Sequence, residues 1–371
     1  MTSPGDWFVL RDIGEVDSPA LIVYKDRVEH NIREMIRIVG DPGRLMPHIK
    51  TYKIAEVIRM QMESGIKRFK CATISEAELL GLTGAEEALL AHQPSEIKMN
   101  RLASLIKTYP GTRFSTLVDN RASADMMNSI VKSTGRSLDV YIDINNGNDR
   151  TGIIPEKTAD LYGYCRELDA INLLGLHIYD GHIRNPDPEE RQKACDTDFE
   201  KVEMLINTLR EQYRVDMEII AGGSPTFPIH AKRKQVICSP GTTLFWDAGY
   251  ASRFEDMPFL PAAVLVTRII SHPAEDLYCL DLGHKAIASE NPLEKRIFFL
   301  NKKGLQPVGH SEEHLVVRNA QKLELKVGDI LYGLPYHVCP TTALYDRVLI
   351  AEDGKITGTW EVTARTRKIN Y

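Results

Sequence analysis

The chain has no long run of apolar residues and no large net charge of either sign. Its apolar stretches are far shorter than the roughly 20 residues that a membrane-spanning helix needs. A net charge of −5 over 371 residues gives no reason to expect binding to nucleic acid or to an anionic membrane. The first 19 residues contain acidic side chains and lack the apolar segment of a signal peptide. We therefore expect a cytoplasmic protein.

Closely spaced cysteines and internal repeats are also missing. The six cysteines are scattered and form no Cys-x-x-Cys pair, which in a chain of this length favours reduced thiols over a disulfide framework. Apolar residues make up 43% of the chain and charged residues 26%, as in an ordinary globular protein. The length suits a barrel with a second domain.

Buried-strand patterns alternate with helical patterns between residue 18 and about residue 254. A typical pair is the apolar segment 18–24, followed by a stretch with apolar residues at Val28, Ile32, Met35 and Ile36, which is helical spacing. This alternation predicts a (β/α)8 barrel of the TIM type. The other predicted strands end in polar or glycine-rich clusters and lie at 44–49, 69–73, 87–91, 114–118, 138–144, 171–179, 217–223 and 235–241.

The pattern changes after residue 254. Short strand-like segments follow one another to the C-terminus, separated by turn signals such as Asp353-Gly354, and no long helical pattern intervenes. We therefore predict a barrel domain at 18–254 and an all-β domain formed by residues 1–17 and 255–371. The segment Trp7–Leu10 is the strand expected from the N-terminal part.

The segment PHIKTYK, residues 47–53, stands at the end of the predicted strand 44–49. Barrel enzymes place their chemistry at the carboxyl ends of strands. A lysine that is desolvated there has a lowered pKa and can act as a nucleophilic amine. The alternative is that Lys50 and Lys53 are solvated lysines at the start of the next helix, as most lysines are.

This segment resembles the PHxKTHK signature of the D-threonine aldolase and D-serine dehydratase family, which consists of alanine-racemase-like, fold-type III pyridoxal phosphate enzymes. The resemblance covers nearly the whole chain. It implies that Lys50 carries pyridoxal 5′-phosphate, that His48 and Lys50 are catalytic, and that the protein is a homodimer with this two-domain layout. Tyr52 stands where the family has its second histidine, which leaves the effect of that change open.

A candidate phosphate-binding loop follows the predicted strand 217–223. Two consecutive glycines, Gly222 and Gly223, let backbone N–H groups approach an anion, and Ser224 and Thr226 add hydroxyl groups. Such a run alone is often a plain turn. Its place after a late strand is where barrels bind phosphate, and it matches the family sequence GGSPT.

Two further segments match the family around the cofactor. Arg150, in NDRTG, resembles the family arginine that reaches the phenolate oxygen of the cofactor, and a solvated loop arginine is the alternative. In HIYDGH, residues 177–182, Tyr179 and His182 are the candidates for lining the cofactor. His177 fits a packed core histidine equally well.

The candidate metal ligands are His337 and Cys339, in the segment YHVCPTT. Residues two apart on an extended segment point to the same side, and imidazole with thiolate favours zinc, with manganese as the alternative. The position matches the family metal site. Within the family, aldolases tend to have His-x-Asp here and dehydratases His-x-Cys.

The resemblance therefore implies a lyase that uses pyridoxal phosphate and a metal to eliminate water from a D-3-hydroxy amino acid. Retro-aldol cleavage of the same substrate class is the first alternative, followed by amino acid racemisation and by a pyridoxal phosphate-binding protein without activity. The partner is a small D-amino acid, with no nucleic acid or membrane. Five residues match family segments without a derivable role: Asp247, Tyr250, Asp281, Lys285 and Glu312.

Overall fold

The computed structural model describes residues 6–371, which form two compact units. The first, here called the barrel unit, consists of Met35–Lys50, Ile58–Gly241 and Thr366–Tyr371. The second, the β unit, consists of Thr51–Val57, Thr242–Arg365 and the chain before Met35. Within the described residues, no helix is long and apolar enough to cross a membrane.

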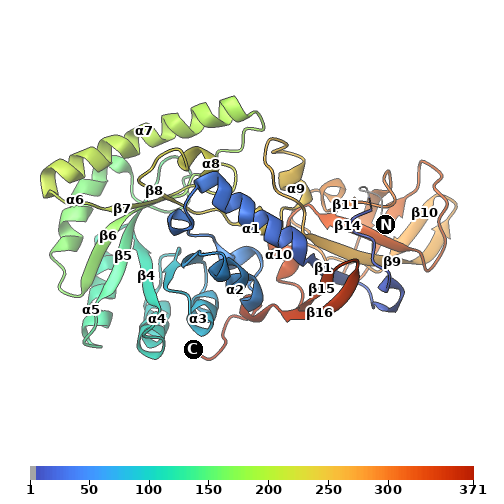
Figure 1. Cartoon of the computed structure of the whole chain (residues 1–371), viewed down its shortest axis with the longest axis horizontal. Coiled ribbons are helices and arrows are strands. Elements are labelled where there is room, and N and C mark those ends of the chain that lie inside the picture. The colour runs from blue at the N-terminus through green and yellow to red at the C-terminus, as the bar shows by residue number, and fades with distance from the viewer. Residues whose placement is uncertain (1–5) are drawn as a thin grey trace. The chain divides into compact units, whose positions relative to one another are not determined.

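The barrel unit contains a parallel sheet in which seven strands follow one another in chain order (Figure 1). Each strand is linked to the next by a helix on the outside of the sheet, as parallel connections require. The strands are β2 (Arg68–Cys71), β3 (Glu87–Leu90), β4 (Arg113–Val118), β5 (Leu138–Ile144), β6 (Ile171–Ile178), β7 (Glu218–Ala221) and β8 (Val236–Cys238). The helices are α3 (Ile74–Thr83), α4 (Glu96–Thr108), α5 (Arg121–Lys132), α6 (Pro155–Arg166), α7 (Pro188–Tyr213) and α8 (Phe227–His230).

The segment before Lys50 fills the gap between the first and last strands of this sheet. Leu45 forms an isolated parallel bridge with Cys238 of β8, and His48 forms one with Lys70 of β2. Pro47 has no N–H, so the segment cannot form a continuous ladder. The predicted barrel is therefore confirmed, with seven regular strands and an irregular eighth segment where a strand at 44–49 was predicted.

The barrel interior has an apolar layer and a polar layer. The apolar layer is a cluster of Met46, Leu89, Leu117, Tyr141, Ile220 and Ile237. The polar layer contains Lys70, Asp143 and His177, which are buried near the carboxyl ends of β2, β5 and β6. This is the end of the barrel at which chemistry is expected.

The β unit is built on a nine-stranded mixed sheet. Its strands are β1 (Ala20–Tyr24), β9 (Ala263–Ala274), β10 (Leu277–Leu280), β11 (Ile297–Phe299), β12 (Gln306–His310), β13 (Leu315–Arg318), β14 (Ile330–Pro335), β15 (Arg347–Glu352) and β16 (Lys355–Glu361). Two helices of four and five residues, α9 (Ala248–Ala251) and α10 (Val338–Thr342), interrupt the strands. The longer helices α1 (Lys25–Val39) and α2 (Ala55–Glu63) each contain a boundary between the two units.

Strand β1 differs from the prediction, which placed residues 18–24 in the barrel. It pairs in parallel with β15 and antiparallel with β9 in the β unit, and four of its five residues are buried. A strand buried on both faces has the same apolar pattern in either sheet, so the sequence could not distinguish them. The predicted strand Trp7–Leu10 is not a strand either, although Phe8 and Leu10 do join the β-unit core.

Candidate active site

Three cationic side chains surround the ring of Tyr179, which directly follows β6. The Nζ atom of Lys50 lies 5.9 Å from the ring centroid, and the Cζ atom of Arg150 lies 4.8 Å from it. The Nζ atom of Lys70 lies 5.8 Å from the same centroid. The structure therefore brings together Lys50, Arg150 and Tyr179, which lie in three separate sequence motifs. It adds Lys70, which the sequence analysis did not identify. A positive cluster of this kind suits a cofactor with a phosphate and a phenolate oxygen.

The glycine-rich loop packs tightly beside this ring. Gly222 has a positive φ of 88°, and a Cβ atom added there would lie 2.9 Å from Cδ2 of His230. A Cβ atom added at Gly223 would lie 3.2 Å from Cε2 of Tyr179. Because both positions exclude a larger side chain, the loop presents backbone rather than side chains next to the cations, as phosphate binding requires.

The two hydroxyl groups of the loop hold its shape. The Oγ1 atom of Thr226 accepts a hydrogen bond from the N–H of Gly223 at 3.0 Å and donates one to Asp180 at 2.7 Å. The Oγ atom of Ser224 accepts from the N–H of Gly241 at 3.1 Å. In this structure the hydroxyl proton of Thr226 therefore goes to Asp180 and not towards a ligand. Contact of Ser224 and Thr226 with phosphate stays a prediction.

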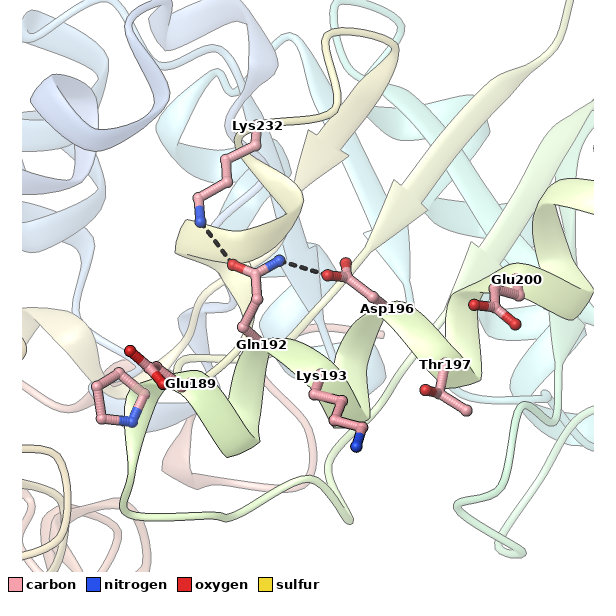
Figure 2. Close-up of a pocket in the computed structure, with 8 residues that line it drawn as sticks. Glu189, Gln192, Lys193, Asp196, Thr197, Glu200 and Lys232 are labelled. Atoms are coloured by element: carbon pink, nitrogen blue, oxygen red, sulfur yellow. Dashed lines mark hydrogen bonds between the residues drawn. The ribbon is translucent and has the colours of Figure 1, made fainter.

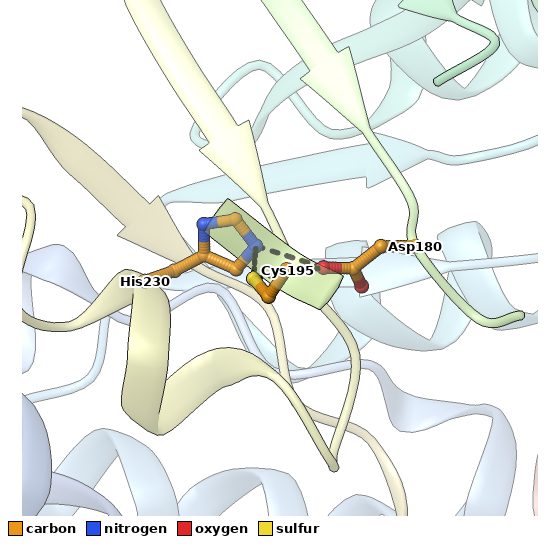
Figure 3. A group of neighbouring side chains, drawn as sticks. All are labelled: Asp180, Cys195 and His230. Carbon is orange, nitrogen blue, oxygen red and sulfur yellow. Dashed lines mark hydrogen bonds and ion pairs between the residues drawn. The ribbon is translucent and has the colours of Figure 1, made fainter. Parts of the chain in front are cut away.

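Asp180 is the centre of a buried group that the sequence did not reveal (Figure 3). Its Oδ2 atom lies 2.8 Å from Nε2 of His230, and the Sγ atom of Cys195 lies 3.4 Å from the same nitrogen. Among the described residues this is the one cluster of three side chains whose ligand atoms are all within 4.8 Å of one another. Its spacing alone would suit a metal ion.

The hydrogen bonds of this group indicate a different role. The guanidinium of Arg233 donates to Nδ1 of His230 at 3.2 Å, so the proton of the neutral ring lies on Nε2 and is donated to Asp180. Burial raises the pKa of the Cys195 thiol, which keeps it protonated and a poor ligand. We therefore assign Asp180 and His230 to bracing the glycine-rich loop through Thr226.

Lys70 belongs to a second buried network. Its Nζ atom lies 3.1 Å from Nε2 of His177 and 2.7 Å from Oγ of Ser239. Nδ1 of His177 lies 2.7 Å from Oδ1 of Asp143. The only sign of this network in the sequence is a lysine in an otherwise apolar strand pattern, FKCAT, and His177 is a hydrogen-bonded histidine, not merely a packed one.

His48 and His182 lie in less direct positions. Nδ1 of the buried His48 accepts a hydrogen bond from the backbone N–H of Lys50 at 3.2 Å, so it orders the turn that carries the lysine. His182 is exposed and pairs with Asp198 at 2.6 Å. Tyr52, at the position of the family histidine, is fully buried and packs against Phe245 with ring centroids 6.1 Å apart. It is a core aromatic residue of the β unit.

The candidate metal ligands lie in the β unit at the start of α10. His337 is the N-cap residue of this helix, and Cys339 is in its first turn. The expectation that both residues lie on an extended segment is therefore wrong, because the helix begins between them. The Sγ atom of Cys339 lies 3.2 Å from Oγ1 of Thr51.

Glu290 gives His337 the partner that a metal-binding histidine usually has. Its Oε1 atom lies 2.5 Å from Nδ1 of His337, and ligating histidines typically donate their second N–H to a carboxylate. Burial alone would lower the pKa of His337, but Cys339, Glu290 and Asp247 together raise it to about 9. The imidazole of His337 and the thiol of Cys339 are side-chain types that suit a zinc ion.

Asp247 fixes the start of α10. Its carboxylate accepts hydrogen bonds from the backbone N–H groups of Val338 and Tyr250, each at 2.9 Å. Burial raises its pKa to about 6, although the backbone hydrogen bonds oppose the shift. Asp247 thus has a structural role beside His337.

Three more of the residues without a derived role also make structural contacts. Asp281 accepts from Oγ1 of Thr267 at 2.6 Å. Lys285 forms an exposed ion pair with Glu312 at 2.9 Å.

A surface pocket along α7 contains none of the predicted site residues. It is lined by polar and charged side chains, and Gln192 bridges Lys232 and Asp196 within it (Figure 2). Such exposed pairs are common on helix surfaces and contribute little energy. We therefore place the candidate active site around Tyr179.

Comparison with known proteins shows the family. Residues 23–248 match the family model described as alanine racemase, N-terminal domain. The chain belongs to the alanine racemase N-terminal domain family. Residues 262–351, which include His337 and Cys339, match the model of a putative serine dehydratase domain. The resemblance to the D-threonine aldolase and D-serine dehydratase family, predicted from the sequence, is therefore confirmed. The prediction of a pyridoxal phosphate-dependent lyase is confirmed at the level of the family.

Individual relatives span nearly the whole chain. A D-threonine aldolase from Arthrobacter sp is 27% identical over 98% of this chain and 95% of its own length. A D-threo-3-hydroxyaspartate dehydratase from Delftia sp. is 24% identical over 93% of this chain and 97% of its own length. The crystal structure of a D-threonine aldolase from Filomicrobium marinum has a TM-score of 0.87 and 25% identity, and covers 95% of this chain and 96% of its own. The relatives thus include both reaction types.

Proposed function

We propose that the protein is a pyridoxal phosphate- and metal-dependent lyase that eliminates water from a D-3-hydroxy amino acid. The observation that carries the proposal is the arrangement of Lys50 and Arg150 around the Tyr179 ring, next to a tightly packed loop that presents the backbone of Gly222 and Gly223. The bound cofactor would supply an electron-withdrawing ring conjugated to the substrate amino group.

Each residue of the site has a distinct task in this proposal. Lys50 would attach the cofactor and then accept the α-proton of the substrate. The guanidinium of Arg150 would stabilise the phenolate oxygen by a charge-assisted hydrogen bond. The glycine-rich loop at Gly222 and Gly223 would approach the phosphate with its backbone, and the ring of Tyr179 would pack beside the cofactor. His48 would keep the Lys50 backbone in place.

His337 and Cys339 would hold the metal ion, which supplies Lewis acidity for the departing hydroxyl group. Zinc suits an imidazole and a thiolate, with manganese as the alternative. A thiolate ligand donates more charge than a carboxylate, and this favours a persistent zinc ion and dehydration. Retro-aldol cleavage is the second candidate because a relative with 27% identity is named as a D-threonine aldolase.

A product assay distinguishes the two reactions. Purified protein is incubated with pyridoxal phosphate, zinc or manganese chloride, and D-serine, D-threonine or D-threo-3-hydroxyaspartate. Dehydration releases ammonia and a 2-oxo acid, whereas retro-aldol cleavage releases glycine and an aldehyde. We expect ammonia with a 2-oxo acid. Glycine with an aldehyde as the main product would show that Cys339 does not decide the reaction.

Removal of the two candidate metal ligands, His337 and Cys339, gives a second prediction. We expect His337→Ala and Cys339→Ala to lower kcat by at least about 100-fold, since they remove the groups that stabilise the leaving group. Metal analysis of the dialysed proteins should show a reduced zinc content. His272→Ala is the matched control because His272 is an exposed histidine of the same unit. Unchanged activity of both variants would exclude a metal role for the pair.

The homodimer that the family resemblance implies and the cytoplasmic location remain predictions.

A further inference from the structure

Lys70 is a deeply buried lysine of the barrel unit. It lies on strand β2 with its side chain in the barrel interior, and only 2% of its surface is exposed. Lysines are almost never buried to this extent unless they are paired or have a function. Its neighbours in the polar layer are a histidine and a serine, so no carboxylate contacts the amine directly.

The direction of each hydrogen bond in this network can be assigned. Asp143 accepts from His177, from Thr151 at 2.9 Å and from Gln93 at 2.8 Å, and these bonds hold its pKa below the ordinary value despite its burial. Burial and the charge of Lys70 lower the pKa of His177, so its ring is neutral. Since Nδ1 of His177 donates to Asp143, its Nε2 is an acceptor for Lys70.

Ser239 is the second hydrogen-bond acceptor of the Lys70 amine. Its hydroxyl donates to the carbonyl oxygen of Gly222 at 2.9 Å and therefore accepts from Lys70. Lys70 thus donates two of its three N–H groups, and among residues 6–371 no acceptor is found for the third. The network links Lys70 to the same glycine-rich loop that the proposed function assigns to the phosphate.

We infer that Lys70 is a second lysine of the cofactor pocket and donates its third N–H to the ring of the pyridoxal phosphate carried by Lys50. His177, oriented by Asp143, is a positioning residue that keeps the Lys70 amine in place. This inference rests on the proposed function. It is supported by the nearly equal distances of the two lysine Nζ atoms from the Tyr179 centroid, 5.9 and 5.8 Å.

The charge of this donor depends on pH near neutrality. Burial, followed by the positive charge of Lys50, lowers the pKa of Lys70 to about 7; Arg150 acts in the same direction, and Asp143 and Asp180 oppose them. Lys70 is therefore charged below about pH 7 and neutral above it. Attachment of the cofactor uses the Lys50 amine and removes one positive neighbour, so we expect the transition of the loaded protein at or above pH 7.

Two variants test the inference through the absorbance of the loaded protein between pH 6 and 9. Lys70→Met keeps the length of the side chain without a donor, and an apolar replacement of a buried charge is commonly tolerated. We expect it to abolish the pH-dependent change in the cofactor spectrum and to weaken pyridoxal phosphate binding at pH 6.5 by about 10-fold or more. Lys70→Arg stays charged throughout this range, so we expect it to bind the cofactor but to show no transition.

Lys67→Met is the matched control because Lys67 precedes the same strand, is exposed and pairs with Glu86. It should keep the wild-type spectrum, transition and affinity. A transition that persists unchanged in Lys70→Met would overturn the inference. If wild-type protein takes up the cofactor and both Lys70 variants show the wild-type transition and affinity, the inference fails and the proposed function stands. If wild-type protein takes up no cofactor, the proposed function fails and the inference with it.

Discussion

Asp180→Ala is expected to lower the free energy of unfolding by about 2–6 kcal/mol, because two buried donors lose their acceptor at a cost of about 1–3 kcal/mol each. The carboxylate accepts from Nε2 of His230 at 2.8 Å and from Oγ1 of Thr226 at 2.7 Å, and all three residues are buried. Alanine would leave both donors without an acceptor. Because Thr226 also holds Gly223, we expect pyridoxal phosphate to dissociate at least about 10-fold more readily.

Asp198→Ala is the matched control for this prediction. Asp198 also pairs with a histidine, His182, at 2.6 Å, but each side chain is 30% exposed. An exposed pair of this kind contributes about 1 kcal/mol or less. Urea unfolding of the two variants and equilibrium dialysis of the cofactor measure both effects. Equal losses in the two variants would show that burial of the Asp180 network does not support the loop.

Lys50→Ala is expected to lower kcat by at least about 10³-fold, because it removes both the amine that attaches the cofactor and the proposed proton acceptor. The measurement is the rate of product formation from the D-3-hydroxy amino acid that the wild-type protein prefers. Unfolding curves should show that the variant is folded, since Lys50 is only partly buried.

Lys53→Ala provides the comparison. Lys53 is the second lysine of the PHIKTYK segment. Its φ of 59° is as unfavourable for alanine as for lysine, so the backbone strain is the same in wild-type protein and in Lys53→Ala. We expect its kcat to stay within about 3-fold of wild type, as for a residue that does not contact the reacting groups. A Lys50→Ala protein that keeps a tenth of the wild-type rate would exclude Lys50 as the attachment site.

The sequence predicted the repeating part of the fold well. Apolar segments followed by polar clusters matched the strands β2 to β8, because parallel strands buried on both faces are continuous apolar runs. It failed where the outcome depends on distant partners. Strand β1 could pair in either sheet, so its apolar pattern did not assign it to one of them.

The site was predicted in part. Lys50, Arg150 and Tyr179 belong to short motifs, and the structure places Lys50 and Arg150 beside the ring of Tyr179. The Asp180 and Lys70 networks were not foreseen, because their members come from segments separated by up to 169 residues, as Lys70 and Ser239 are. Hydrogen bonds across the interior of a barrel have no local sequence pattern, so only packing reveals them.

The central claim is that Lys50 carries pyridoxal phosphate, and borohydride reduction followed by peptide mass analysis tests it most directly. The protein is incubated with pyridoxal phosphate, reduced, digested and searched for a phosphopyridoxyl lysine. We predict one modified lysine, Lys50, and no modification of Lys53 or Lys70. Attachment at Lys70 in place of Lys50, or no specific attachment at any lysine, would contradict the assignment of the cofactor to the Tyr179 pocket through Lys50.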